Sequence, residues 1–193
     1  MEGSLFEAGK DYWGWNCNEL DNDLRRLPRD IPGVTRSMLY AGMFKSCFAW
    51  HTEDLDLFAL NFLHWGAPKS WWVVPPSNKK SFETRMDGVC AAVRHETGCK
   101  AFLRHKTSLV SPSHLEGAAR VTRVIQRQGE WIFVYAGAFH CGYNHGLNVA
   151  ESVNFCFPQW LPFGRVAEKQ RCPCNPLAVS FAVDSIYPPT PSS

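Results

Sequence analysis

The chain of 193 residues is long enough for one domain with a sizeable core, and its 45% hydrophobic and 20% charged content is that of an ordinary globular protein. A formal net charge of +2 is too small to indicate electrostatic binding of nucleic acid. No apolar run approaches the ~20 residues of a membrane span, and Met1–Ser4 lacks the pattern of a signal peptide. We therefore expect a reducing, cytosolic or nuclear compartment, with the eight cysteines as thiols or metal ligands.

The hydrophobic pattern predicts mostly strands. Apolar stretches rich in β-branched and aromatic residues, bounded by Gly and Pro turns, are typical of strands. They run over residues 38–50, 55–65, 69–74, 100–110, 121–126, 130–135 and 138–155, the last broken by Gly142 and Gly146. The stretches 55–65 and 69–74, joined by a turn at 66–68, predict a hairpin.

One main helix is predicted over residues 77–95. Ser77 can cap it. The apolar residues recur at helical spacing: Phe82, Met86, Val89, Cys90 and Val93. Shorter helices are expected over 18–27 and from Ser111 to Leu115.

Many short strands with one main helix predict a mainly β fold, a double-stranded β-helix of the jelly-roll or cupin kind with a few flanking helices. The expected organisation is an N-terminal flanking segment, the barrel, a C-terminal segment and a Pro/Thr/Ser-rich disordered tail. Their expected boundaries are 1–35, 36–166, 167–186 and 187–193.

The stretch 48–54 carries the first chemical signal. It begins as an aromatic strand, in which side chains at i and i+2 share a face, so His51 and Glu53 are predicted to point one way and Asp54 the other. Opposing early and late strands of a barrel would add His140. Two imidazoles and one carboxylate form the facial triad that holds Fe(II) with open coordination positions. The alternative is a surface carboxylate beside a partly buried histidine.

Four other histidines are weaker candidates for this metal: His64, His95, His114 and His145. His95 and His114 lie in helical or turn contexts and are expected to be exposed. His145 follows His140 by five residues, so strand parity does not place both side chains on one face.

An oxygenase with such a centre needs a co-substrate that supplies electrons, and the carboxylate of that co-substrate would require a buried cation. Lys69 stands beside Trp71 and Trp72 in a predicted strand, where an ammonium group needs a partner. Asn61 lies in the same predicted hairpin. The alternative is a lysine at the strand edge, on the surface.

A second metal site is predicted from three thiols and one imidazole: Cys99, His105, Cys172 and Cys174. This set is typical of structural zinc when the four ligands converge. Cys-x-Cys is ambiguous by itself, and a pair of thiols without a metal remains the alternative.

The same motifs lie in four segments of the chain: Gly42–Asp54, Asn61–Trp71, Phe102–Lys106 and Phe139–Gly146. Together they resemble the JmjC domain of histone lysine demethylases, and the resemblance runs from about Ser4 to Cys174. The arrangement of Cys, His and Cys-x-Cys narrows it to the Jumonji-domain-2 group, which acts on trimethyl-lysine.

The resemblance implies an Fe(II)- and 2-oxoglutarate-dependent dioxygenase that demethylates di- or trimethyl-lysine on the histone H3 tail. It also implies a nuclear monomer without sequence-specific nucleic-acid binding or a membrane anchor. The implied iron ligands are His51, Glu53 and His140, and the implied 2-oxoglutarate residues are Phe48, Asn61 and Lys69. The implied zinc ligands, which would link the segment 167–186 to the barrel, are Cys99, His105, Cys172 and Cys174. The methylated ammonium would lie near Gly33, Tyr40, Glu53, Ser152 and Asn154, with Lys106 on the oxygen-binding side.

Three features depart from the pattern of this group. The tyrosine that hydrogen-bonds 2-oxoglutarate would lie before Met1, the preceding JmjN segment is not in the sequence, and Met38 stands where an aromatic residue usually lines the peptide groove. These departures favour two other interpretations: a fragment, or a diverged and weakened enzyme that serves as a chromatin-binding barrel. A hydroxylase of a protein or small molecule that does not demethylate is a further alternative.

Overall fold

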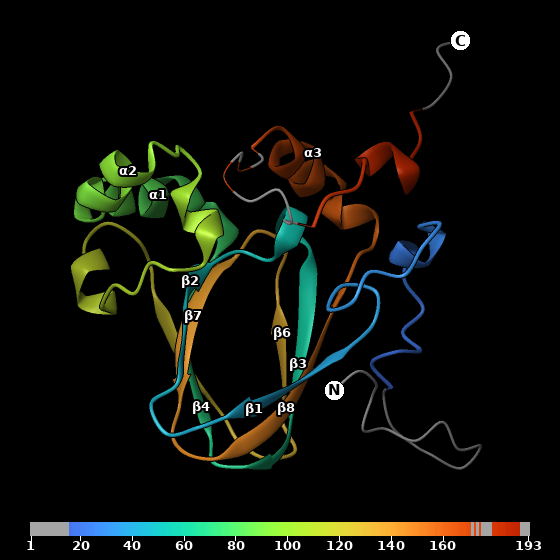
Figure 1. Cartoon of the computed structure of the whole chain (residues 1–193), viewed down its shortest axis with the longest axis horizontal. Helices are drawn as coiled ribbons and strands as arrows, with labels where there is room; N and C mark the ends of the chain where they lie inside the picture. The colour runs from blue at the N-terminus through green and yellow to red at the C-terminus, as the bar shows by residue number, and fades with distance from the viewer. Residues whose placement is uncertain (1–15, 171, 173, 175–178, 190–193) are drawn as a thin grey trace.

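The chain folds into two four-stranded antiparallel sheets that face each other as a barrel (Figure 1). The computed structural model describes residues 16–170, 172, 174 and 179–189. In one sheet the strand order is β1 (Met38–Gly42), β8 (Asn148–Phe155), β3 (Phe58–Gly66) and β6 (Trp131–Val134). In the other it is β2 (Cys47–His51), β7 (Phe139–Asn144), β4 (Lys69–Val74) and β5 (Thr122–Gln126). The predicted mainly β barrel is confirmed.

Helices gather at one end of the barrel (Figure 1). The α-helices are α1 (Lys79–Val89), α2 (Ala91–Thr97) and α3 (Leu161–Lys169). Short 3-10 helices are η1 (Asp23–Arg26), η2 (Asp54–Asp56), η3 (Pro76–Asn78), η4 (Phe102–His105), η5 (Pro112–Leu115), η6 (Pro158–Trp160) and η7 (Val183–Ser185). Both candidate metal clusters come from this end, because β2 ends there, β7 begins there and η4 lies beside them.

Side chains alternate between the barrel interior and the outer faces of the sheets. A small buried cluster that includes Trp71 and Val134 lies inside the barrel. Two larger cores lie outside it: one under η6, around Trp160, and one under α1, around Trp50 and Phe82. Because these outer cores supply most of the apolar burial, the interior has room for the polar side chains of a site.

A bulge in β2 sets the direction of the first histidine. Phe48 opposes Gly142 and His51 opposes His140, so three steps along β2 match two along β7. The extra residue lets both Phe48 and His51 face the interior, while Trp50 turns outward into the core under α1. Simple alternation would have placed Phe48 and His51 on opposite faces.

The predicted hairpin over 55–74 is wrong. The strands β3 and β4 lie in different sheets, since β3 pairs with β6 and β8 whereas β4 pairs with β5 and β7. Both edges of each strand are therefore taken by more distant segments, and the turn at 66–68 connects two sheets. Strand pairing in this barrel depends on contacts between distant segments, so a short turn between two strands does not predict that they pair with each other.

The prediction of a strand over 100–110 is also wrong, because this segment contains the 3-10 helix η4. Phe102 and Leu103 are consecutive and both are buried, so this short apolar run shows neither the helical period of 3.6 nor the strand period of 2 clearly. Gly98 and Lys106 have φ of 60° and 58°, which turns the chain before and after this segment. The 3-10 helix η5 confirms the short helix expected up to Leu115.

The predicted helix over 77–95 forms as two helices that meet at Cys90. Phe82, Met86 and Cys90 are buried as expected, but Val89 and Val93 are exposed. Asn78, and not Ser77, occupies the N-cap position, and its side chain makes no capping hydrogen bond.

Two further expectations concern the C-terminal half. The strand β7 continues through Gly142, so the predicted break lies near Gly146 alone. The tail was expected to be disordered from Tyr187, yet the Tyr187 hydroxyl donates a hydrogen bond to Asp23 and its ring lies 6.3 Å from that of Trp160. Residues 190–193 lie outside the described part of the chain. Within the described residues, no helix is both long and apolar enough to cross a membrane.

Candidate active site

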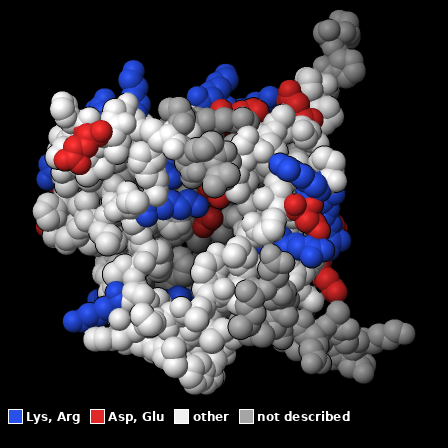
Figure 2. Space-filling view, in the orientation of Figure 1, with Lys and Arg blue, Asp and Glu red and all other residues white. Residues whose placement is uncertain are grey.

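Three predicted metal ligands meet inside the barrel. One nitrogen each of His51 and His140 and one carboxylate oxygen of Glu53 lie within 4.8 Å of one another. His140 Nε2 is 3.3 Å from Glu53 Oε1, and the two imidazole centroids are 4.2 Å apart. Figure 2 shows a hollow near the middle of the face, with acidic and basic side chains at its margin, over the barrel mouth between β2 and β3 of Figure 1.

Both imidazoles are fixed in the form that a metal requires. Nδ1 of His51 lies 2.7 Å from the Ala49 carbonyl oxygen, and Nδ1 of His140 lies 3.1 Å from that of Ala138. A carbonyl only accepts, so each Nδ1 carries the proton and each Nε2 keeps its lone pair for a cation. Both histidines use the carbonyl two residues earlier in the chain.

The electrostatics favour a neutral His51 beside an ionised Glu53. Burial, together with the neighbouring His140, lowers the pKa of His51 to about 3. Burial opposes ionisation of Glu53, but its contacts with the His140 and His51 rings and a hydrogen bond from Asn154 outweigh burial and hold the pKa of Glu53 well below its usual range. Two neutral nitrogens and one anionic oxygen fit Fe(II), since no thiolate takes part.

Glu53 is oriented by a residue from the opposite sheet. Asn154 on β8 donates from Nδ2 to Glu53 Oε2 at 3.1 Å and to the Phe58 carbonyl at 3.1 Å. Although Glu53 follows the end of β2, it shares the interior with His51 as predicted, and Asp54 points elsewhere, to Lys106 at 3.3 Å.

The predicted substrate residues Gly33, Tyr40, Ser152 and Asn154 can each be placed by their contacts. Ser152 neighbours Met38 on β1, and its hydroxyl donates to the Leu60 carbonyl at 2.8 Å. The backbone amide of Asn154 donates to the carbonyl of Val34, which follows Gly33. Tyr40 is 47% exposed. Burial and the charges of Glu53 and Asp54 raise the pKa of Tyr40, so its hydroxyl lies near these carboxylates.

Lys69 is a buried cation with a neutral partner. Its side chain is 5% exposed, and Nζ donates to Asn144 Oδ1 at 2.6 Å. No described acidic residue forms an ion pair with it. Burial lowers the pKa of Lys69 to about 8. An anion that enters the barrel would restore the missing counter-charge.

Asn61 and Phe48 complete the interior beside Lys69. Asn61 is buried, and its Oδ1 accepts a hydrogen bond from Gln126, whose strand pairs with β4 at Lys69. The Phe48 ring packs edge-on against Trp71, with centroids 4.7 Å apart. The Phe48 ring lies over Gly142, the glycine of β7. A Cβ at this position would overlap the Phe48 ring and the Ser70 carbonyl oxygen, so the ring fits only because Gly142 has no side chain.

The other histidines stay away from the ligand group, as expected. His64 pairs with Glu151 at 2.7 Å, and His145 Nε2 lies 2.8 Å from the Ser70 hydroxyl. His95 and His114 are exposed. Lys106 is nearer, because its charge contributes to lowering the pKa of His51.

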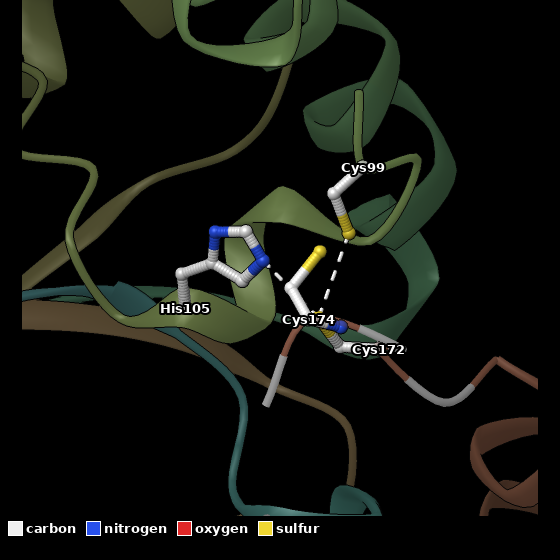
Figure 3. Close-up of side chains that lie close together, drawn as sticks. All are labelled: Cys99, His105, Cys172 and Cys174. Carbon is white, nitrogen blue, oxygen red and sulfur yellow. Dashed lines mark hydrogen bonds between the residues drawn. The ribbon is translucent and has the colours of Figure 1, made fainter. Parts of the chain in front are cut away.

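The second cluster also converges. Ligand atoms of Cys99, His105, Cys172 and Cys174 lie within 4.8 Å of one another. Cys99 Sγ is 3.5 Å and His105 Nε2 is 3.1 Å from Cys172 Sγ. Figure 3 shows the sulfur atoms and the ring turned toward a common point, with Cys99 and His105 on the loop and η4 after α2 and the other two on the C-terminal segment. Four such donors suit a tetrahedral metal.

Several interior residues could not be found from motifs. Asn144 and Gln126 hold Lys69 and Asn61 through hydrogen bonds across strands, and Asn148 donates to Asn144 at 3.0 Å. Gln126 lies in an exposed strand with no motif around it. For Asn144, the one available signal was its place four residues after His140, on the same face of β7.

The chain is similar in sequence to several known proteins. Residues 38–155 match the sequence model of the JmjC domain, described as a hydroxylase. Human "Probable lysine-specific demethylase 4F" and rat "Lysine-specific demethylase 4D" are each 39% identical over 190 residues, 96% of this chain. Mouse "Lysine-specific demethylase 4B" is 39% identical over 189 residues, 95% of this chain. The chain spans 29%, 36% and 17%, respectively, of the length of these relatives. The match over more than half of the chain shows that this protein belongs to the JmjC domain family.

Proposed function

We propose that the chain is an Fe(II)- and 2-oxoglutarate-dependent dioxygenase that removes methyl groups from a lysine side chain of a histone tail. The observation that carries the proposal is the meeting of His51, Glu53 and His140 inside the barrel with both Nε2 lone pairs free. The buried ammonium of Lys69, which hydrogen-bonds the neutral Asn144 and has no ion pair among the described residues, supports an anionic co-substrate. The demethylase names of three relatives support the reaction class.

The chain's residues would bind and orient the reactants. His51, Glu53 and His140 would hold iron on one side and leave the other side open. Lys69 would pair with the distal carboxylate of 2-oxoglutarate, while Phe48 would exclude water beside it. Iron with 2-oxoglutarate and dioxygen supplies hydroxylation of an N-methyl carbon, with succinate and carbon dioxide as co-products. The resulting hemiaminal then releases formaldehyde.

The substrate in this proposal is a methylated lysine of the histone H3 tail. In this proposal the methylated ammonium would lie beside oxygen atoms of Tyr40, Ser152 and Asn154 and the Glu53 carboxylate, because such oxygens make weak C–H···O contacts with polarised N-methyl groups. A histone substrate implies that the protein works in the nucleus.

The Cys99, His105, Cys172 and Cys174 cluster would hold a structural zinc. Such a zinc would tie the C-terminal segment to η4, and its binding energy would contribute directly to folding.

The decisive experiment incubates the protein with Fe(II), 2-oxoglutarate and trimethyl-lysine H3 peptides. Mass spectrometry should show peptide masses lower by one CH2 unit, because a methyl group is replaced by hydrogen, together with formaldehyde, and His51→Ala should abolish both. His95→Ala is the matched control, because His95 is exposed on α2 and should retain activity. A gain of oxygen without methyl loss would instead indicate a hydroxylase, and peptide binding without succinate release would indicate a binding domain.

A further inference from the structure

The turn directly after the candidate iron ligands has an uncommon backbone. Leu55 and Asp56 have φ of 51° and 53°, in the left-handed region that residues other than glycine rarely adopt. Two such residues in succession persist only where the surrounding contacts hold them. Since Glu53 lies immediately before this turn, the contacts that hold the turn also set the position of Glu53.

Main-chain hydrogen bonds connect the turn to both ligand segments. The Asp56 amide donates to the Glu53 carbonyl at 2.9 Å, and the Gly137 amide donates to the Asp56 carbonyl at 3.1 Å. Gly137 lies three residues before His140, at the entry to β7. The peptide groups of Asp56 therefore join the segment that carries Glu53 to the segment that carries His140.

The side chain of Asp56 connects the same turn to α1 and η4. Its carboxylate is 1% exposed and forms an ion pair with Lys79 at the start of α1. Nη2 of Arg104 on η4 lies 3.5 Å from the other carboxylate oxygen. A buried carboxylate is stable only when cations or hydrogen bonds compensate its charge, so removal of that charge loosens all three elements together.

These cations do not face the iron site. Lys79 and Arg104 line a cavity together with Phe139. On β7, Phe139 and His140 face opposite sides, and the Phe139 ring packs against Phe82 in the core under α1. The cavity therefore lies on the side of β7 that faces away from the ligands. Asp56 therefore acts on the ligands through the backbone and does not touch the metal position.

We propose that Asp56 is a positioning residue of the iron site: held by Lys79 and Arg104, its carboxylate fixes the turn that sets the distance between Glu53 and His140. The inference rests on the proposed iron site and does not depend on the substrate.

The test replaces the charge and retains the shape. Asparagine has the size of aspartate and also tolerates left-handed backbone, so Asp56→Asn removes little except the charge. The probe is Mn(II), which favours oxygen and nitrogen ligands over thiolates, added to the full chain preloaded with zinc. Electron paramagnetic resonance of free Mn(II) should give a dissociation constant about tenfold or more above that of the unmodified protein. The control Asp184→Asn, from an exposed pair with Arg165, should change nothing.

A purely structural role would give another result. If Asp56→Asn lowers the melting temperature while the Mn(II) dissociation constant stays unchanged, the inference is wrong. If this variant does not fold, Arg104→Gln serves instead, because Lys79 still neutralises the carboxylate. We expect a smaller rise in the dissociation constant for Arg104→Gln, and an unchanged value would equally overturn the positioning role.

The same titration separates this inference from the proposed function. An unmodified protein that binds Mn(II) but yields no formaldehyde would contradict demethylation. The role of Asp56 would then still be decided by the Mn(II) dissociation constants of the unmodified protein and Asp56→Asn. Formaldehyde release with equal Mn(II) affinity in both proteins would contradict the role of Asp56 alone. An unmodified protein that does not bind Mn(II) would contradict both.

Discussion

The ammonium group of Lys69 lies 2.6 Å from the amide oxygen of Asn144. The two residues are paired on the neighbouring strands β4 and β7. The partner is neutral, and among the described residues no carboxylate pairs with this cation. A buried lysine without an anionic partner is destabilising by itself, which is understandable where a ligand supplies the anion.

Lys69→Met should weaken 2-oxoglutarate binding. Methionine retains most of the apolar stem but loses the charged hydrogen-bond donor, a change that costs about 1.5–3 kcal/mol, or roughly 10- to 150-fold in the dissociation constant. Isothermal titration with 2-oxoglutarate and Mn(II) measures it. Lys80→Met on the exposed side of α1 is the matched control. Equal affinities in the two variants would remove Lys69 from the co-substrate site.

Lys69 should also make stability depend on pH in the absence of 2-oxoglutarate. Its folded-state pKa of about 8 lies below the ordinary 10.5, so the unfolded chain binds more protons between these values. The free energy of unfolding should therefore rise as pH increases from about 8 to 10.5, by about 3 kcal/mol relative to Lys69→Met. Urea unfolding of both proteins across this range measures the difference. Parallel curves for the two proteins would contradict the lowered pKa.

Gly142→Ala should disturb the barrel interior. The added methyl group would overlap the Phe48 ring and the Ser70 carbonyl, and the resulting overpacking costs about 1–3 kcal/mol. Displacement of Phe48 should also raise the 2-oxoglutarate dissociation constant. Gly88→Ala in α1 is the control, because nothing lies within 4 Å of its Cβ position, and it should stabilise by up to ~1 kcal/mol. Thermal unfolding and titration of both variants measure the contrast.

Cys174→Ser should remove zinc and lower stability. A serine hydroxyl is a poor zinc ligand, so the remaining three donors hold the metal weakly and its contribution to folding is lost. Elemental analysis should find about one zinc per unmodified chain and less in the variant, with a lower melting temperature. Cys47→Ser is the control, since Cys47 is an exposed free thiol outside the cluster. Equal zinc contents in both variants would contradict the site.

Individual elements of the fold could be predicted where one local period is clear. The strand predicted over 55–65 forms as β3, Phe58–Gly66. Phe82 and Met86 were expected on the buried face of a helix and lie there. Where apolar residues are consecutive, as at Phe102 and Leu103, no period is visible and the predicted strand was wrong.

The sequence by itself determined which residues could bind metal and that the chain forms a mainly β barrel, because ligand chemistry and strand alternation are local properties of residue type and spacing. The resemblance of its motifs to the JmjC domain is confirmed by the family match over residues 38–155. Only the tertiary structure decided which strands pair, how the bulge in β2 turns His51 inward beside Phe48, and that Asn144 is the partner of Lys69. These features depend on contacts between distant segments and on one extra residue in a strand, and neither can be inferred from the local spacing of residues.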